Sequence, residues 1–366
     1  MQNSSIYYKI YICIWDFAKG HRQATIAVLR LSVKERMTNL YGYEVFHERI
    51  LKSLIDSVRA GKSQHAYIFA GEAGIGKRRA ARLFSAALVC ENKNLAPCGS
   101  CHACIGAKAG TNPDIKYITP GDKKSIGTDI MRELSADAYV RPFESGQKIY
   151  IIEDGDIITE QAQNAFLKIL EEPPEYAVFI ILVSNLSMLL QTIISRCTVI
   201  RFTALPRERV KEYIKGRYPT ADADFLAAYS GGNPGKADMI MEKEDFFPLR
   251  QNALKLILPM VSRHTISAYR IADFLEENKD DAKLILEIWQ SMLRDMILIK
   301  TGATQYIINS DIEKELREIS GHIELKTCVI AENALVRCSE MLRRYVNLRA
   351  AALNLSLSIK KAASGE

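Results

Sequence analysis

Apolar residues follow two alternating spacings in the first part of the chain. Short apolar runs predict buried strands, and between them lie segments whose apolar residues recur every three or four positions, as in an amphipathic helix. The predicted strands are residues 66–70, 148–152, 177–183 and 198–202, and the predicted helices are residues 50–58, 79–89, 126–138, 160–171 and 187–194. Strands that alternate with helices indicate an α/β fold with a parallel sheet covered on both faces.

The strand pattern stops after Pro206. Short helices are predicted over residues 207–218 and 221–229, and the run GGNPG at residues 231–235 then interrupts the chain. From residue 246 to the end the apolar period is helical. Because 366 residues are too many for one ordinary core, the chain is expected to form two or three domains.

The first 36 residues show neither a clean period nor the length of a domain. Met37 could itself be the initiating residue, because a regular helical pattern starts soon after it. We therefore interpret residues 1–36 as an extension that is disordered or that comes from an upstream start.

Composition narrows the class of protein. The hydrophobic content of 48% and the charged content of 25% are typical of a soluble globular protein. No apolar run is long enough to cross a bilayer, and the short one at residues 10–15 lacks a cleavage site, so a cytoplasmic protein is expected. The net charge of +6 is mild and fits contact with an anionic partner better than a dedicated nucleic-acid binder.

The first predicted strand leads into the sequence GEAGIGKR, residues 71–78. A phosphate-binding loop reads G-x-x-x-x-G-K-[ST]: its backbone N–H groups hold phosphate, its lysine neutralises charge and its hydroxyl ligates Mg²⁺. Gly71, Gly76 and Lys77 fit this pattern, with Gly74 between them, but Arg78 replaces the hydroxyl residue. Since a guanidinium cannot ligate a metal ion, the loop indicates an ATPase frame that does not hydrolyse ATP.

A second feature of an ATPase is an acidic pair at the end of a neighbouring strand. The predicted strand at residues 148–152 ends in Glu153 and Asp154, whereas the usual order is Asp followed by Glu. The exchange changes the reach of each side chain by one methylene, and a misplacement of that size can cost about 10²-fold in rate. This pair therefore also argues against hydrolysis.

Four of the eight cysteines lie close together, as Cys90, Cys98, Cys101 and Cys104. Thiolates in C-x-x-C spacing can share one tetrahedral Zn²⁺, and a reducing cytosol disfavours disulfides between them. An iron–sulfur cluster is the alternative, but the chain has neither a C-x₃-C-P run nor a second cluster. Because four sulfurs fill the coordination shell, the predicted zinc site is structural, with His102 as a bystander.

The run NAFLKILEEPP at residues 164–174 is followed about twenty residues later by Ser195, Arg196 and Cys197. These motifs resemble the clamp-loader branch of the AAA+ ATPases, over roughly residues 38–245, while the C-terminal part is similar only in size and pattern. The cysteine insert is typical of the bacterial subunits of this branch. Arg78 in place of a hydroxyl residue points to its delta-prime type, which belongs to DNA polymerase III.

The resemblance implies an architecture of three parts. A RecA-like AAA+ domain would cover residues 37–203 and include the zinc insert 90–104, a helical lid would cover 204–243, and a helical collar of 246–366 would oligomerise. A leucine-rich helix is expected over residues 342–359, with more apolar residues than one face needs. It would pack in the collar core and also contact a helix of a neighbouring subunit in the ring.

It also implies a function. Chains of this type are non-catalytic stators in a hetero-pentameric ring with gamma/tau and delta subunits, and the ring loads the sliding clamp onto primer-template DNA. Arg196 would be an arginine finger for the ATP of a neighbouring subunit. Ser184 and Asn185 occupy the sensor position, and any DNA contact would be sequence-independent and salt-sensitive.

Two other interpretations stay open. The chain could be an active clamp-loader ATPase of the gamma/tau type, with Lys77 and Asp154 working despite Arg78. It could also be a zinc-bearing DNA-binding protein, although residues 90–104 hold only Lys93 beside Glu91. The residues leave open whether Lys77 binds nucleotide without hydrolysing it.

Overall fold

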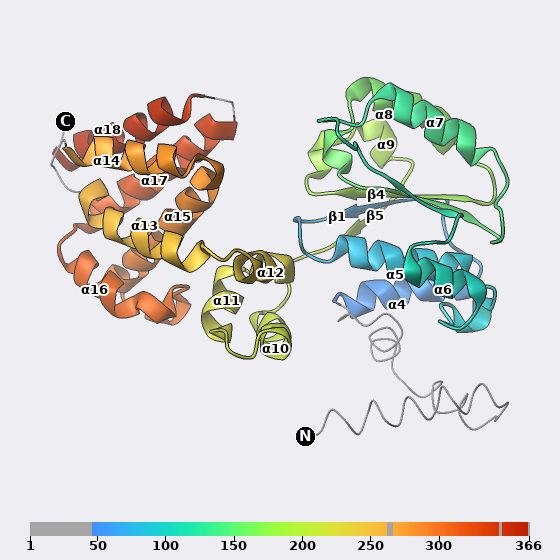
Figure 1. The fold of residues 1–366 in the computed structure, drawn as a ribbon, viewed down its shortest axis with the longest axis horizontal. Coiled ribbons are helices and arrows are strands. Elements are labelled where there is room, and N and C mark those ends of the chain that lie inside the picture. Colours follow the sequence, from blue (N-terminus) through green and yellow to red (C-terminus); the bar gives the residue numbers. More distant parts are fainter. Residues whose placement is uncertain (1–45, 262–265, 344–345, 365–366) are drawn as a thin grey trace. The chain divides into compact units, whose positions relative to one another are not determined.

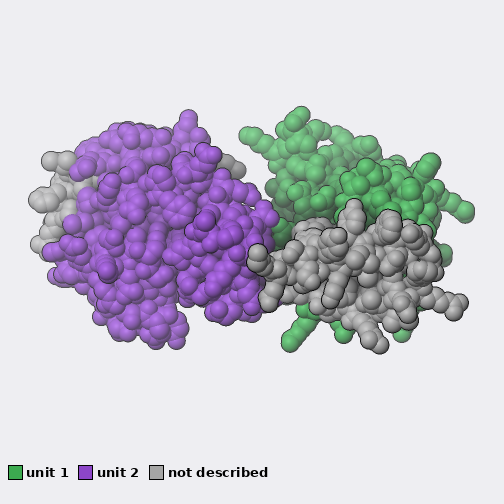
Figure 2. Space-filling model, turned by 60° about the horizontal axis from the view of Figure 1, so that its bottom comes forward, with its two compact units in different colours: residues 1–204 green, residues 205–366 purple. Residues whose placement is uncertain are grey.

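A computed structural model describes residues 46–261, 266–343 and 346–364 of the chain. The predicted extension 1–36 lies outside these residues. The chain divides into two compact units, Met1–Ala204 and Leu205–Glu366, which are coloured separately in Figure 2.

The first unit is built on a sheet of five parallel strands in the order β2-β3-β4-β1-β5. The strands are β1 (Ala66–Ala70), β2 (Ile115–Ile118), β3 (Lys148–Ile152), β4 (Ala177–Val183) and β5 (Thr198–Arg201). Every residue of β1, β3 and β4 is buried. This burial explains why these three strands read as continuous apolar runs.

Helices cover both faces of the sheet (Figure 1). One face carries α4 (Glu48–Arg59), α5 (Lys77–Val89) and α6 (His102–Ala109), and the other carries α7 (Thr128–Ala138), α8 (Glu160–Glu171) and α9 (Gln191–Ile194). Because side chains alternate along a strand, Tyr67 and Phe69 of β1 join the core under α5, whereas Ala66 and Ile68 join the core under α8. The predicted α/β fold with a parallel sheet is confirmed.

Three details of the first unit differ from the sequence-based expectation. Strand β2 was not predicted, because it is an edge strand whose four residues are all only half-buried and form no apolar run. Helix α6 was not predicted either, because it begins inside the cysteine segment: His102 is its first residue, Cys101 is its N-cap, and Gly110 follows its last residue. The predicted helix over 187–194 is a 3₁₀ turn (Leu186–Met188) followed by the short α9.

The described residues of the second unit form helices that are connected by turns and loops. It begins with α10 (Arg207–Arg217), α11 (Ala223–Tyr229) and α12 (Pro234–Glu242), and continues with α13 (Phe246–Val261), α14 (Ile266–Glu277), α15 (Ala282–Thr301), α16 (Glu313–Gly321), α17 (Leu325–Arg343) and α18 (Leu348–Ser364). Trp289 of α15 is fully buried, and its Nε1 donates to the carbonyl of Ala253 at 2.8 Å. None of the helices in the described part of the chain is long and apolar enough to cross a membrane.

The predicted single helix over residues 342–359 is wrong. Helix α17 ends at Arg343, and α18 begins at Leu348. Asn347 caps the second helix, since its Oδ1 accepts a hydrogen bond from the backbone N–H of Ala350 at 3.1 Å. An asparagine favours this position because its side chain satisfies an N–H group that has no partner within the helix. The excess of leucines is therefore distributed over two helices.

Candidate functional site

The glycine loop connects β1 to α5. At Gly71 a Cβ atom would lie 2.3 Å from the carbonyl oxygen of Phe202, so a side chain there requires the backbone to move. Gly74 (φ 83°) and Gly76 (φ 106°) adopt backbone conformations that L side chains rarely take. The predicted strand–loop–helix context of the motif is therefore present, with Gly76 as the residue before α5.

Lys77 is buried at the first position of α5 and is 8% exposed. Its Nζ donates hydrogen bonds to the carbonyl oxygens of Gly71 and Glu72, the second at 2.9 Å. Burial lowers the pKa of Lys77, and the nearby charges of Asp156, Asp154 and Glu72 oppose this shift. The ammonium group thus points into its own loop and binds the backbone that would otherwise surround a phosphate.

Arg78 pairs with Glu153 at the end of β3. Its Nε donates to Oε1 at 2.5 Å, and its Nη2 donates to Oε2, so that the pair is bidentate. The Glu153 side chain is only 7% exposed, whereas that of Arg78 is 67% exposed. The hydrogen bond to Glu153 raises the pKa of Arg78. The carboxylate that follows the β3 strand is therefore neutralised by the residue that replaces the metal-binding hydroxyl.

Asp154 and Asp156 take different positions beside this pair. Asp154 has a left-handed backbone (φ 53°), whereas the carboxylate of Asp156 accepts the backbone N–H groups of Ser184 at 2.6 Å and Asn185 at 2.7 Å. The Oδ1 of Asn185 in turn accepts a hydrogen bond from the N–H of Ser187. The sensor-like residues are thus joined to the acidic segment through Asp156, which the sequence did not single out.

Arg196 follows the short helix α9 and does not contact the glycine loop. Its Nη1 donates to the carbonyl of Thr192 at 2.9 Å, and its Nη2 donates to Oε1 of Glu171 at 2.6 Å. The side chain is 36% exposed. Glu171 is the last residue of α8, so the NAFLKILEEPP motif and the Ser195–Cys197 motif meet at this ion pair. The two motifs that carried the resemblance are joined in space.

The four clustered cysteines converge between α5 and α6. Their sulfur atoms all lie within 4.8 Å of one another, and Cys98 and Cys104 are 4.0 Å apart. Tetrahedral Zn²⁺ with bonds of about 2.3 Å places sulfur atoms about 3.8 Å apart, so the residues fit this group. Backbone N–H groups donate to the sulfurs of Cys90, Cys98 and Cys101, each at 3.4 Å, which favours thiolates.

His102 is set apart from the four sulfurs. Its side chain is 81% exposed, and its Nδ1 lies 3.4 Å from the carboxylate of Glu144.

The hydrogen bond with Cys104 lowers the pKa of Cys90 to about 5. The described residues therefore offer four sulfur ligands and one thiol that ionises early.

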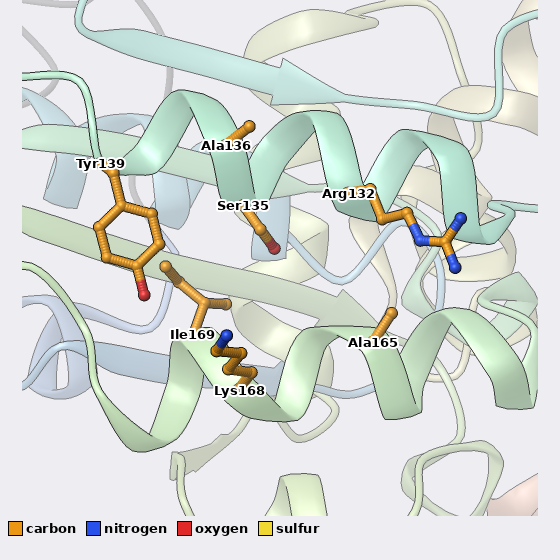
Figure 3. A pocket seen from close by; sticks show the side chains of 7 residues that line it. All are labelled: Arg132, Ser135, Ala136, Tyr139, Ala165, Lys168 and Ile169. Carbon is orange, nitrogen blue, oxygen red and sulfur yellow. The ribbon is translucent and has the colours of Figure 1, made fainter.

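A separate pocket of about 340 Å³ lies between α7 and α8 (Figure 3). Its lining comes from the two facing helices: Arg132, Ser135, Ala136, Tyr139, Ala165, Lys168 and Ile169. The side chains of the glycine loop and of the cysteine cluster do not line it, so this pocket belongs to neither site.

Taken together, a parallel sheet in the order β2-β3-β4-β1-β5, a glycine loop after β1, an acidic segment after β3 and a helical second unit define a protein of the AAA+ class. Two family models extend this assignment. The model for "DNA polymerase III, delta subunit" matches residues 46–206, and the model for its C-terminal part matches residues 244–356. The chain belongs to the family of DNA polymerase III clamp-loader subunits.

Two relatives that are similar in sequence agree with the family models. The chain is 26% identical to the DNA polymerase III subunit delta′ of Bacillus subtilis over 317 residues, which cover 86% of this chain and 96% of that protein. It is 28% identical to subunit tau of the same organism over 324 residues, covering 81% of this chain and 56% of tau. A solved gamma-subunit-related protein of Thermotoga maritima covers 86% of this chain and 99% of its own, with 20% identity and a TM-score of 0.40.

Proposed function

We propose that this chain is a non-hydrolysing subunit of the delta-prime type in the clamp loader of DNA polymerase III. The observation that carries the proposal is the bidentate pair between Arg78 and Glu153. A hydrolytic site of this class needs Mg²⁺ bound by a hydroxyl and a carboxylate. Here the guanidinium replaces the hydroxyl and occupies the carboxylate, so both protein groups that would hold the ion are used.

The contacts of Lys77 support the same conclusion. An ammonium group that already donates to Gly71 and Glu72 must break these hydrogen bonds before it can bind a β- or γ-phosphate. The backbone of the loop keeps the conformation of a phosphate-binding loop, but these contacts of Lys77 disfavour productive ATP binding. Ser184 and Asn185 retain the sensor position in this proposal and are held there by Asp156.

Arg196 is the residue through which the chain would act on ATP. We propose that it is an arginine finger in trans, which stabilises developing charge on the γ-phosphate of a nucleotide bound by a neighbouring gamma/tau subunit. Its guanidinium is partly exposed and donates to Glu171 and Thr192 within the chain, so it must leave these acceptors to reach a phosphate of the partner. Glu171 would release Arg196 as the interface forms.

The partners follow from the family. The ring would contain subunits of the gamma/tau and delta types, and the sliding clamp and primer-template DNA would be indirect partners in the cytoplasm. Within the second unit we assign residues 204–243 to a lid and residues 246–366 to a collar that joins the ring. The first unit would be the AAA+ domain of residues 37–203.

We further propose that the four cysteines hold one structural Zn²⁺. Four sulfurs complete a tetrahedral shell, which leaves no position for a substrate, and Cys90 and Cys104 are buried in the core under α5. Zinc would supply cross-links between α5 and α6, and no catalytic step.

ATP hydrolysis by the reconstituted ring tests the proposal. The ring carrying Arg196→Ala is compared with the wild-type ring and with Arg201→Ala, an exposed arginine five positions away, while the isolated chain is assayed alongside. We expect no hydrolysis by the isolated chain. Arg196→Ala should lower the rate at the neighbouring site by roughly 10³–10⁵-fold, the range for arginine fingers, and Arg201→Ala should leave it unchanged.

The possible contrary results separate the parts of the proposal. Hydrolysis by the isolated chain would show that it is a motor subunit. A ring that is insensitive to Arg196→Ala would remove the trans-acting role and leave the closed nucleotide loop in place.

A further inference from the structure

We infer that the cysteine module, residues 90–104, braces the loop of residues 140–147. Bound metal would then order residues 143–145 of this loop, although they contain no metal ligand. The inference rests on the proposed zinc site. The loop connects α7 to β3 and follows the pocket residue Tyr139 of Figure 3. The loop carries Phe143, which is 85% exposed.

Asp114 holds the backbone of this loop. It lies just before β2 and is 1% exposed. Its carboxylate accepts three successive backbone N–H groups, those of Phe143 at 2.6 Å, Glu144 at 3.0 Å and Ser145 at 2.7 Å. Burial would raise the pKa of Asp114, but these three donors lower it, as expected when hydrogen bonds favour the charged form. The carboxylate therefore orders three residues whose own side chains do not anchor them in a core.

Asn112 connects Asp114 to the cysteine module. Its Oδ1 accepts the backbone N–H of Asp114 at 2.9 Å, and its Nδ2 lies 3.4 Å from the carbonyl oxygen of Ala103 and 3.3 Å from Oε1 of Glu144. Asn112 is 4% exposed, so water competes little for these groups. The buried amide of Asn112 thus contacts the first turn of α6, the backbone of Asp114 and the loop of residues 140–147.

His102 makes the second connection. It opens α6 directly after Cys101, and its Nδ1 lies 3.4 Å from Oε2 of Glu144. His102 and Ala103 are the two residues between the ligands Cys101 and Cys104. The position of both contacts therefore depends on the turn that the metal would hold closed.

The other end of the loop is held without the module. Nζ of Lys148 donates to the carbonyl oxygens of Asp137 at 2.9 Å and Val140 at 3.3 Å, and the hydroxyl of Tyr176 donates to the carbonyl oxygen of Tyr139 at 2.8 Å. Tyr176 packs against the core under α8, and Lys148 lies on the same face of β3 as Tyr150 of that core, whereas the four cysteines belong to the core under α5. Metal removal is thus expected to loosen residues 143–145 and to leave residues 139–140 in place.

Amide hydrogen exchange of the full chain tests this inference. Exchange is measured in the zinc-loaded protein, after chelation, and after zinc is restored, with metal content measured in each sample. We expect chelation to accelerate exchange of the amides of residues 143–145 by at least about tenfold. The amides of Val140 and of strand β4 should change by less than about twofold, and zinc should reverse the effect.

A variant that retains the metal separates the brace from general unfolding. Asn112→Ala removes the connecting amide but no sulfur ligand, and Lys108→Ala, on the exposed end of α6, is the matched control. Asn112→Ala should keep one zinc per chain and still accelerate exchange at residues 143–145. Lys108→Ala should leave exchange as in the wild type.

Each remaining outcome is decisive. If zinc leaves and residues 143–145 exchange as before, the brace is wrong while the metal site stands. If the purified chain binds no zinc at all, the proposed metal site fails and the brace with it. If chelation also exposes β4, Asn112→Ala decides: local acceleration supports the brace, and unchanged exchange overturns it.

Discussion

Helix α5 has the glycine loop at its first residue and the first clustered cysteine directly after its last, and the ligand groups at its two ends are used in opposite ways. At the start of the helix, Lys77 donates to backbone carbonyls and Arg78 binds Glu153, so the cationic groups already have acceptors within the protein. At the end of the helix, four sulfur atoms face one another within 4.8 Å.

The difference lies in the sign of the charges that meet. A loop with two cations beside acidic residues neutralises itself, because each cation finds an anion or a carbonyl nearby. Four thiolates would carry more negative charge than three backbone N–H donors and the nearby Lys93 offset, so they repel one another unless a cation binds between them. The glycine loop, in which Arg78 replaces a hydroxyl residue, therefore satisfies its cations within the protein. The cysteine cluster, which has all four sulfur ligands, still requires a cation.

Loss of the metal should give the largest effect on stability. If it gives none, the contrast drawn between the two ends of α5 is wrong. Cys104→Ser removes a buried ligand, and we expect loss of zinc together with several kcal/mol of stability, on the order of 10 °C in Tm for a unit of this size. Thermal unfolding with and without chelator measures this. Cys338→Ser is the control, a buried cysteine outside the cluster. Equal destabilisation in both variants, or no response of the wild type to chelator, would contradict a metal-dependent module.

The Arg78–Glu153 pair should give a smaller effect. Arg78→Ala leaves the nearly buried carboxylate of Glu153 without its partner, and Glu153→Gln removes the charge from the other side. Because Arg78 is 67% exposed, solvent screens the pair, and we expect a coupling energy of about 1 kcal/mol in a double-mutant cycle. Urea unfolding of the four proteins measures it, with the surface pair Arg317–Glu313 of α16 for reference. Strictly additive losses would mean that the two side chains do not stabilise the folded chain by their interaction.

Replacement of Lys77 should have the smallest effect, a small change in the ATPase rate of the ring. It tests whether the glycine loop is occupied by its own contacts. In a hydrolytic subunit this lysine is indispensable, whereas here Lys77→Met should change the ATPase rate of the reconstituted ring by less than about twofold. Lys52→Met, an exposed lysine of α4, serves as control. A large loss of activity in Lys77→Met would show that the loop binds nucleotide in the ring.

The same variant has a pH signature. Burial lowers the pKa of Lys77 below its ordinary value of 10.5, so between the two values the unfolded chain binds more protons than the folded chain. Raising the pH through this window therefore stabilises the wild type relative to Lys77→Met. Urea unfolding of both proteins at pH 8 and pH 10 should show this divergence, and parallel curves would contradict the desolvated ammonium.

Much of the fold was predictable because its strands are buried on both faces. Strands β1, β3 and β4 read as apolar runs, and the glycine loop falls between β1 and α5 as the motif requires. Strand β2 escaped prediction because an edge strand with half-buried residues carries no such signal. The break between α17 and α18 escaped because apolar residues continue on both sides of the cap at Asn347.

The sequence by itself determined which residues are present for chemistry: the loop without its hydroxyl, the acidic segment after β3, the four cysteines and Arg196. Short spacings are enough for this, since neighbours in the chain are neighbours in space. Only the tertiary structure decided the partners of these groups. Arg78 meets Glu153 across 75 positions of sequence, Arg196 meets Glu171 across 25, and Asp114 meets the amide of Phe143 across 29. Such contacts depend on how strands and helices pack side by side, and no local pattern of residues encodes that distance.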